Sequence, residues 1–429
     1  MEAAKFARCL VSYATMDDDA MGRDTFIKRQ DGLHSILVND GNDQPMKIKL
    51  VQAIVKSKAI VSRSTTCYKT EDGHVAKFSW APKKLKTEVE TLKLAEEKGV
   101  QGVVRLVAHC QITDIATMRK GLQFLDAHRF RGVEVLSEDM PQATASSTFS
   151  GKKRKASSDP VTGKKPSPKK PRVLGQKSSG VQDVQSPNAG GSAASTEDTW
   201  NDRILSCLVV SPAGRVLTNF GTVRELLEVM RDAIKAHQSL YTTGGILHRD
   251  ISPNNIIITD PAVSGGYRGM LIDLDMAKVL GSGRSGARNL TGTIQFMAVE
   301  VLQGADHTYR HDLESFLYVL LWMCARQSWH NGFPAQDEKA PPASYLRRWE
   351  IGSLYDLAAN KQGDMTIGGV RRIMSEFPAS LNGVKPLCLK LRSSLFGDTA
   401  DLTLGTPAED PTQLYASILA AYDDTIGIL

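Results

Sequence analysis

Two carboxylates and one amide stand at spacings that suit phosphoryl transfer. Asp250 ends the stretch His248-Arg249-Asp250, and Asn255 stands five residues after it. Asp273 comes at the end of an apolar run. Phosphoryl transfer needs a carboxylate that orients the attacking hydroxyl and accepts its proton, and oxygen ligands for magnesium ions on the phosphates. We therefore assign Asp250 as the candidate proton acceptor, and Asn255 and Asp273 as candidate magnesium ligands.

The loop around Asp250 is similar to the His-Arg-Asp-x-x-x-x-Asn catalytic loop of protein kinases. We count Arg249 and Ser252 with Asp250 as catalytic candidates. Ser252 stands where serine/threonine kinases usually place a lysine that contacts the transferred phosphate, so one positive charge is missing. Lys278 and Arg249 lie nearby in sequence.

Lys77 is the candidate to bind the nucleotide phosphates, because it lies in a short strand pattern upstream of the catalytic loop. The alternative is an ordinary solvated strand lysine. The helix predicted over residues 82–98 offers two partners, Glu88 and Glu90. Glu88 shares a helix face with Leu92, which turns it inward, whereas Glu90 lies on a charged face. We therefore choose Glu88 as the partner of Lys77.

The hairpin before Lys77 is expected to cover the nucleotide phosphates. Glycine normally allows the backbone to close over phosphates, but residues 61–68 contain none. We assign Ser62, Ser64 and Thr65 to nucleotide binding through their hydroxyls, with a loss of affinity. The alternative is a plain strand pair in a protein that binds nucleotide poorly.

The elements around these residues predict an α+β fold. Residues 204–210 have the pattern of a buried strand, and residues 222–241 that of a helix in which Thr222 and Glu225 have capping-box spacing. Residues 312–326 are apolar nearly all round, which predicts a helix at the centre of a helical domain.

The bulk composition is that of a soluble globular protein. Apolar residues make up 41% and charged residues 23% of the 429 residues. The six cysteines are scattered, which favours a reducing compartment over a disulfide framework. The first residues have no long apolar core, so no signal peptide is expected, and no apolar run is long enough to span a membrane.

The positive charge is concentrated in one segment. Residues 151–177 hold ten Lys or Arg and one Asp, whereas the whole chain has a net charge of +6. The rest of the chain is therefore slightly acidic, and no specific nucleic-acid binding is predicted. Residues 141–199 are rich in Ser, Gly, Pro and Lys and lack apolar periodicity, which predicts a disordered insertion.

Two basic clusters within residues 152–172 have the layout of a bipartite nuclear-import signal. An import receptor would bind them as an extended peptide, and the prolines between and within them disfavour helix. The alternative is a solvated charge run that keeps the insertion soluble. We expect a nuclear location, or one shared between nucleus and cytoplasm.

Taken together, the chain resembles the fungal-type protein kinase family, a divergent branch of the protein kinases. The resemblance runs from residue 50 to 400, and the chain looks shorter at its N-terminus than many members. The matching stretches are residues 61–66, 77–80, 212–215, 246–256, 271–275, 292–298 and 311–315.

This resemblance implies a bilobal protein-kinase-like fold with a small β-rich N-lobe and a larger helical C-lobe. It places an N-terminal extension at residues 1–50, the N-lobe at 51–215 with the basic insertion 141–199, and the C-lobe at 216–429. It also implies that ATP and Mg²⁺ are the cofactors, that protein serine and threonine hydroxyls are the substrates, and that Asp312 anchors the catalytic loop.

Two departures from ordinary kinases leave alternatives open. Asp275 replaces the glycine of Asp-Phe-Gly and either binds metal or caps the turn, of which we prefer the cap. Val299 replaces the proline of Ala-Pro-Glu, although Glu300 remains. The glycine-free hairpin and Val299 favour a pseudokinase that acts as an interaction scaffold, whereas the retained Lys77, Asp250, Asn255 and Asp273 oppose it. A small-molecule kinase is the third alternative. Residues 292–300 argue against it, because such a segment forms a platform for a protein substrate.

Overall fold

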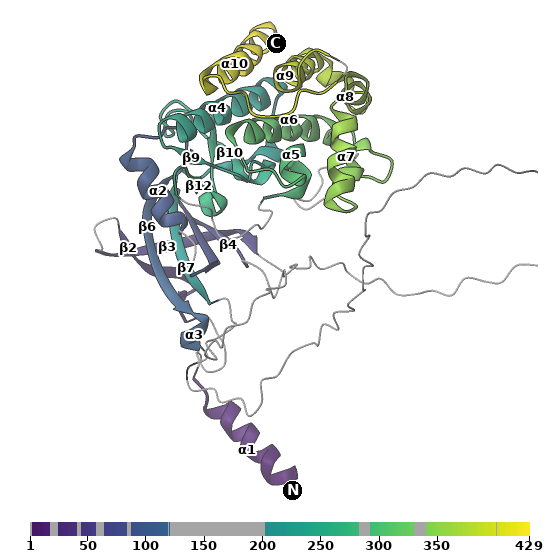
Figure 1. Ribbon diagram of the computed structural model, residues 1–429. Helices are drawn as coiled ribbons and strands as arrows, with labels where there is room; N and C mark the ends of the chain where they lie inside the picture. The colour runs from purple at the N-terminus through teal and green to yellow at the C-terminus, as the bar shows by residue number, and fades with distance from the viewer. Residues whose placement is uncertain are drawn as a thin grey trace, which may run out of the picture. The chain divides into compact units, whose positions relative to one another are not determined.

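The computed structural model describes residues 2–17, 25–40, 44–56, 64–83, 87–118, 120, 202–282, 292–329, 340–399 and 401–429. The predicted disordered insertion, the import clusters and Ser62 lie outside these residues. Strands and helices are both present, as an α+β fold requires (Figure 1). Within the described residues, no helix is long and apolar enough to cross a bilayer.

Seven antiparallel strands form the larger sheet, in the order β1-β2-β3-β4-β5-β7-β6. β2 also pairs with β6, through Asn39 opposite His109 and Asp40 opposite Ala108, which closes six of the strands into a barrel. The strands are β1 (Lys28–Gln30), β2 (Leu33–Asp40), β3 (Pro45–Lys56), β4 (Thr66–Thr70), β5 (Val75–Pro82), β6 (Arg105–Asp114) and β7 (Arg203–Ser211).

Alternate residues of these strands fill the barrel interior. Ile36 and Val38 of β2 pack with Ile48 of β3, Phe78 of β5 and Val209 of β7, as the two-residue period of a strand requires. The boundary expected at residue 50 therefore falls inside β3, and residues 28–50 supply strands of the same sheet rather than a separate extension.

The remaining short strands lie around the catalytic loop. One three-stranded sheet has the order β11-β10-β8, and β12 pairs with β9. Their bounds are β8 (Arg215–Val216), β9 (Ile246–Leu247), β10 (Ile256–Ile258), β11 (Gly269–Leu271) and β12 (Lys278–Val279).

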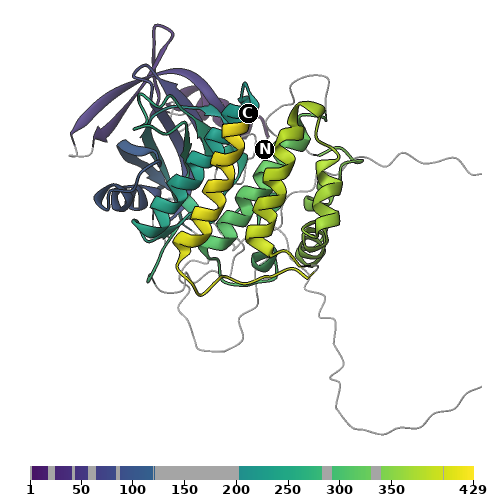
Figure 2. The same ribbon diagram turned by 90° about the horizontal axis from the view of Figure 1, so that it is seen from above.

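The second large core is helical. α10 lies along α4 and also packs against α9 (Figure 2). The helices are α1 (Glu2–Thr15), α2 (Glu88–Glu97), α3 (Ile115–Met118), α4 (Val223–Thr242), α5 (Val299–Leu302), α6 (Tyr309–Arg326), α7 (Leu354–Asp364), α8 (Ile367–Met374), α9 (Lys385–Phe396) and α10 (Pro411–Ile428).

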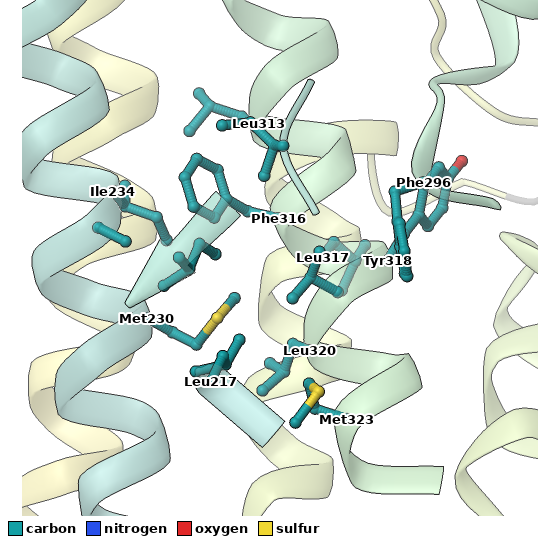
Figure 3. Packing of buried hydrophobic residues seen from close by; sticks show 14 of the residues in the cluster. Leu217, Met230, Ile234, Phe296, Leu313, Phe316, Leu317, Tyr318, Leu320 and Met323 are labelled. Carbon is teal, nitrogen blue, oxygen red and sulfur yellow. The ribbon is translucent and has the colours of Figure 1, made fainter. Parts of the chain in front are cut away.

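α6 is the centre of this core. Every residue of the helix is buried, which confirms the prediction from its all-round apolar pattern. Met230 and Ile234 of α4 approach Phe316 and Leu317 of α6 in the close view (Figure 3). The buried helix starts three residues earlier than predicted, because Thr308 supplies its N-cap.

Candidate active site

The strand geometry of β5 turns Lys77 toward α2. Its neighbours Ala76 and Phe78 point into the barrel, so the alternation of the strand places Lys77 on the outer face. The side chain is only 9% exposed, and its Nζ lies 2.7 Å from Glu88 Oε2. The pair predicted between a strand lysine and the following helix is therefore present.

Glu88 and Glu90 have different tasks at the start of α2. Glu90 closes a capping box: its carboxylate accepts from the Thr87 backbone N–H at 2.9 Å, and its own N–H donates to Thr87 Oγ1 at 3.3 Å. Glu88, one residue into the helix, is buried and also accepts from Leu274 N–H at 3.1 Å. The helix predicted over residues 82–98 is therefore shorter: Thr87 caps it, so it begins at Glu88, and β5 extends to Pro82.

Two further carboxylates reach Lys77 from the turn after β11. Asp273 Oδ1 lies 3.0 Å and Asp275 Oδ2 3.2 Å from Nζ. Burial on its own lowers the pKa of Lys77, but the charges of Glu88, Asp273 and Asp275 outweigh it and raise the pKa well above its usual value. Lys77 is therefore a permanent cation within an acidic cluster.

The cap of this turn is Asp273 rather than Asp275. Asp273 has a left-handed backbone (φ 65°), and its Oδ1 accepts from the Asp275 N–H at 3.3 Å. The preference for Asp275 as the cap is thus wrong, because its side chain is directed to Lys77 instead. Ligand oxygens of Glu88, Asp273 and Asp275 lie within 4.8 Å of one another, close enough to hold one metal ion.

Asp250 is held from the opposite side of the catalytic loop. Its Oδ1 accepts from both the backbone N–H and the hydroxyl of Thr293, at 2.8 and 2.9 Å. Gly292 makes this approach possible, since it has φ 116° and a Cβ there would come within 2.8 Å of Arg249 O. The structure therefore brings residues 292–293 directly onto the candidate proton acceptor.

Asn255 and Ser252 complete the same loop. The amide nitrogen of Asn255 donates to the backbone carbonyl of Asp250 at 2.8 Å. Ser252 is buried and precedes the short 3-10 turn Pro253–Asn255. Within the described part of the chain, the Ser252 hydroxyl forms no hydrogen bond, so its catalytic role stays a prediction.

Asp312 fixes the backbone of the catalytic loop. Its wholly buried carboxylate accepts from the N–H groups of His248 and Arg249, at 3.2 and 3.1 Å, and contacts Nε2 of His237 and His307, both at 2.8 Å. Burial opposes ionisation, but His307 and His237 hold the pKa of Asp312 well below its usual value. Arg249 is held with φ 69°.

The hairpin between β3 and β4 is described only in part. Ser64, with φ 46°, and Thr65 precede β4, whose Cys67 is paired with Lys77 of β5. These two residues thus lead into the strand beside Lys77, whereas Ser62 lies outside the described residues. Their assignment to nucleotide phosphates stays a prediction.

Thr293 and His237 were not assigned roles from the sequence. Thr293 follows Gly292, and it is 43 residues from Asp250. No sequence pattern near either residue indicates that Thr293 contacts Asp250. His237 belongs to the apolar face of α4, and a histidine on such a face is the one signal that could have indicated a buried polar network. It links Tyr415 OH, at 2.7 Å from Nδ1, to Asp312.

A family model described as fungal protein kinase matches residues 1–324 of the chain. Among known proteins, casein kinase I homolog 2 of Saccharomyces cerevisiae is 24% identical over 189 residues, which cover 42% of this chain and 34% of that protein. The inhibitor of nuclear factor kappa-B kinase subunit alpha of Danio rerio is 32% identical over 114 residues, or 26% and 14% of the two chains. A serine/threonine-protein kinase STE7 homolog of Candida albicans is 36% identical over 76 residues, or 18% and 12%. The matches span about a third of these relatives' length or less.

Proposed function

The chain belongs to the fungal protein kinase family, and from this premise we propose that it is an ATP- and Mg²⁺-dependent protein kinase that phosphorylates serine or threonine hydroxyls. We assign the barrel with α2 to the small lobe of a bilobal kinase and the helical core to the large lobe. Two of the similar proteins are named as a casein kinase I homolog and a serine/threonine-protein kinase, which supports this substrate class.

One observation carries the proposal above the others: Lys77, Glu88 and Asp273 meet in space. They come from β5, α2 and the turn after β11, and Lys77 is 196 residues from Asp273 in sequence. A buried lysine with a helix glutamate and a metal-binding aspartate is the arrangement that kinases use to hold nucleotide phosphates.

The acidic cluster fits a divalent cation with a nucleotide. Glu88, Asp273 and Asp275 all contact the ammonium of Lys77, and Asp273 is the most exposed of these carboxylates, at 27%. The amide nitrogen of Asn255 donates to Asp250 O, so the side-chain oxygen of Asn255 is the atom that would bind a metal. Asp273 and Asn255 would hold Mg²⁺, and Lys77 the phosphates. When bound, ATP and Mg²⁺ supply the phosphoryl group and neutralise its charge.

The chain's own contribution is to orient the acceptor hydroxyl. Asp312 fixes the backbone of the loop, and Thr293 binds Oδ1 of Asp250, so that the carboxylate has one defined direction. A serine or threonine hydroxyl of the substrate would donate its hydrogen bond to Asp250 and lose its proton there as the phosphate is transferred. Residues 292–298 lie next to Asp250 and would receive the substrate backbone.

A scaffold without transfer activity is the second candidate. The observation that favours it is Asp275, which adds a third carboxylate to Lys77 in competition with phosphate. Both candidates are compatible with a nuclear location through residues 152–172, which we propose on charge pattern alone.

Transfer and binding assays on two variants test the proposal. We expect Asp250→Asn to abolish autophosphorylation and transfer to casein while it retains ATP binding with Mg²⁺. We expect Asp273→Ala to lose the Mg²⁺-dependent thermal shift with ATP, because the principal metal ligand is gone. A native protein that binds ATP and Mg²⁺ but transfers nothing would support the scaffold; an unchanged thermal shift in Asp273→Ala would sink the metal assignment.

A further inference from the structure

Lys361 of α7 is a lysine with no exposed surface, far in sequence from the catalytic loop. Its Nζ donates to the backbone carbonyl of Met297 at 2.5 Å and lies 3.3 Å from that of Ile294. Both carbonyls belong to residues 292–298, which we call the platform segment. An ammonium group is thus buried beneath the segment that lies against Asp250.

The ammonium of Lys361 is stabilised by these two carbonyls and by two aromatic rings. Nζ lies 4.5 Å from the ring centroid of Tyr318 and 5.3 Å from that of Trp349, within the range of cation–π attraction. Glu314 and Asp364 are the carboxylates that act on it. In the part of the chain that the structure describes, neither of them nor any other carboxylate forms an ion pair with Lys361.

The two carboxylates have partners of their own. Glu314 accepts from Val299 N–H at 2.7 Å and from Arg310 Nη1 at 2.9 Å. Asp364 accepts from Trp349 Nε1 at 2.8 Å and pairs with Arg348. Lys361 is therefore not needed to neutralise them, and its donors serve the platform segment.

The platform segment is consequently held at successive points. Thr293 binds Asp250 through its N–H and its hydroxyl, and the next residue, Ile294, faces Lys361 with its carbonyl. Met297 accepts the shorter bond from the same ammonium. The carbonyl that lies 3.3 Å from Lys361 Nζ thus belongs to the residue directly after the one that binds Asp250.

When Lys361 is charged, its burial lowers the stability of the folded chain. Burial lowers its pKa to about 7 from 10.5, although Glu314 and Asp364 oppose the shift. The folded pKa lies below the unfolded one, so the unfolded chain binds more protons between these values. Stability is therefore gained as pH rises from 7 toward 10.5, and an apolar side chain of the same length would avoid this penalty.

We propose that Lys361 is a positioning residue for phosphoryl transfer to proteins. It holds the carbonyls of Ile294 and Met297, and this keeps Thr293 on Asp250 and the platform segment in the shape that receives a substrate chain. The part of the proposal that concerns substrate rests on the proposed kinase function, whereas the part that concerns the platform backbone does not.

Two substitutions separate the donor from the side chain's bulk. Lys361→Met keeps an unbranched side chain, one atom shorter, and removes the donors, and Lys361→Gln keeps an uncharged donor. Lys390→Met, on the exposed side of α9, is the matched control. Amide hydrogen exchange of residues 292–298 is measured on all four proteins, together with Kd for ATP with Mg²⁺ and kcat/KM for casein.

We expect Lys361→Met to speed exchange of the Thr293 amide by about tenfold or more and to lower kcat/KM for casein by a similar factor. Kd for ATP should stay within about twofold, because Lys77 and Asp273 are untouched. Lys361→Gln should lie between the wild type and Lys361→Met, and Lys390→Met should match the wild type. If Lys361→Met does not fold, the same comparison is made with Lys361→Gln.

A pH profile adds a readout that a merely structural residue would not change. The wild type should lose kcat/KM for casein as pH rises through about 7 and the ammonium becomes neutral, and this descending limb should be absent from Lys361→Met. The titratable groups that act on Lys361 are Glu314 and Tyr318 of α6 and Asp364 of α7. Glu314 is bound by Arg310 of α6, and Asp364 by Arg348 of residues 345–349.

Three results would overturn the proposal: native exchange rates across residues 292–298 in a folded Lys361→Met, an equal loss of ATP affinity and casein transfer, or the same pH profile in both proteins. If the wild type transfers nothing to casein, the kinase function fails instead. Hydrogen exchange at Thr293 then decides the structural part by itself.

Discussion

Asn255 is tied to Asp250 by a hydrogen bond from its amide nitrogen to the Asp250 backbone carbonyl, at 2.8 Å. This bond selects one orientation of the amide and directs the oxygen atom away from that carbonyl. The proposed metal ligand and the proposed proton acceptor are therefore positioned by one another. A substitution at either position should affect both functions.

We expect Asn255→Asp and Asn255→Ala to differ in a defined way. Asn255→Asp keeps an oxygen ligand and loses the donor, so transfer to casein should fall about tenfold or more while Mg²⁺ still supports ATP binding. Asn255→Ala removes the oxygen ligand as well, so ATP affinity should depend less on the Mg²⁺ concentration. Titration of ATP affinity against Mg²⁺ measures this. Equal Mg²⁺ dependence in both variants would remove Asn255 from the metal site.

Lys77→Met should make the stability of the chain dependent on divalent cations. The change takes from Glu88, Asp273 and Asp275 the ammonium that all three contact, and removal of one partner from a buried ion pair destabilises by about 3–5 kcal/mol. Mg²⁺ alone should restore part of the lost melting temperature. Lys83→Met is the control, because Lys83 pairs with Asp114 and Asp202 but is half exposed. A Mg²⁺ response of the same size in the control would contradict the assignment.

Glu88→Gln should flatten the dependence of stability on pH. Burial raises the pKa of Glu88 to about 8 from 4.5 although Lys77 opposes it, and the charges of Asp275 and Asp273 add to the rise. The folded state then holds more protons than the unfolded state between these values, so Glu88 lowers stability as pH rises through this range.

The glutamine variant has no such titration. Its melting temperature should therefore improve relative to the wild type between pH 5 and 8. Glu90→Gln provides the comparison, since Glu90 is at the exposed capping box. Parallel pH curves for Glu88→Gln and the wild type would show that Glu88 is ionised throughout.

Asp312→Ala should damage the catalytic loop and leave the nucleotide site intact. The N–H groups of His248 and Arg249 lose their acceptor, and unpaired buried donors cost about 1–3 kcal/mol of the unfolding free energy. His237 also loses its carboxylate partner, although it keeps the contact with Tyr415. Asp306→Ala, at an exposed position nearby, should match the wild type. Denaturant unfolding and Kd for ATP measure the two effects, and native stability with native transfer would refute the anchor role.

The local parts of the site could be predicted from the sequence. Asp250, Asn255 and Asp273 stand in short motifs, and the choice of Glu88 over Glu90 followed from helix faces. α6 was predicted because an all-round apolar helix has to be buried. These features depend on residues within a turn or two of one another.

The rest depends on contacts between distant segments. β2 closes the barrel through residues 39–40 and 108–109, and no pattern within either segment specifies that pairing. Thr293 reaches Asp250 across 43 residues, and Lys361 reaches Met297 across 64. Asp275 was misjudged for the same reason, since its partner Lys77 lies 198 residues away.

The import signal proposed in residues 152–172 is tested apart from the kinase. Lys152-Lys153-Arg154-Lys155 forms the first cluster, and residues 164–172 contain the second. We expect a fluorescent reporter fused to residues 141–199 to accumulate in the nucleus, and Lys→Ala changes in both clusters to abolish this, because an import receptor would bind lysine side chains of an extended chain.

Phosphorylation offers a second arm of the same experiment. Ser167-Pro168 lies within the second cluster, and a phosphate there adds about −1.5 to −2 charges. Ser167→Glu should therefore reduce nuclear accumulation relative to Ser167→Ala. Weak attraction to nucleic acid would fade with salt, so retention in permeabilised nuclei is compared at low and high salt. Equal distribution of the native and Lys→Ala reporters between nucleus and cytoplasm would show that the charge run only keeps the segment soluble.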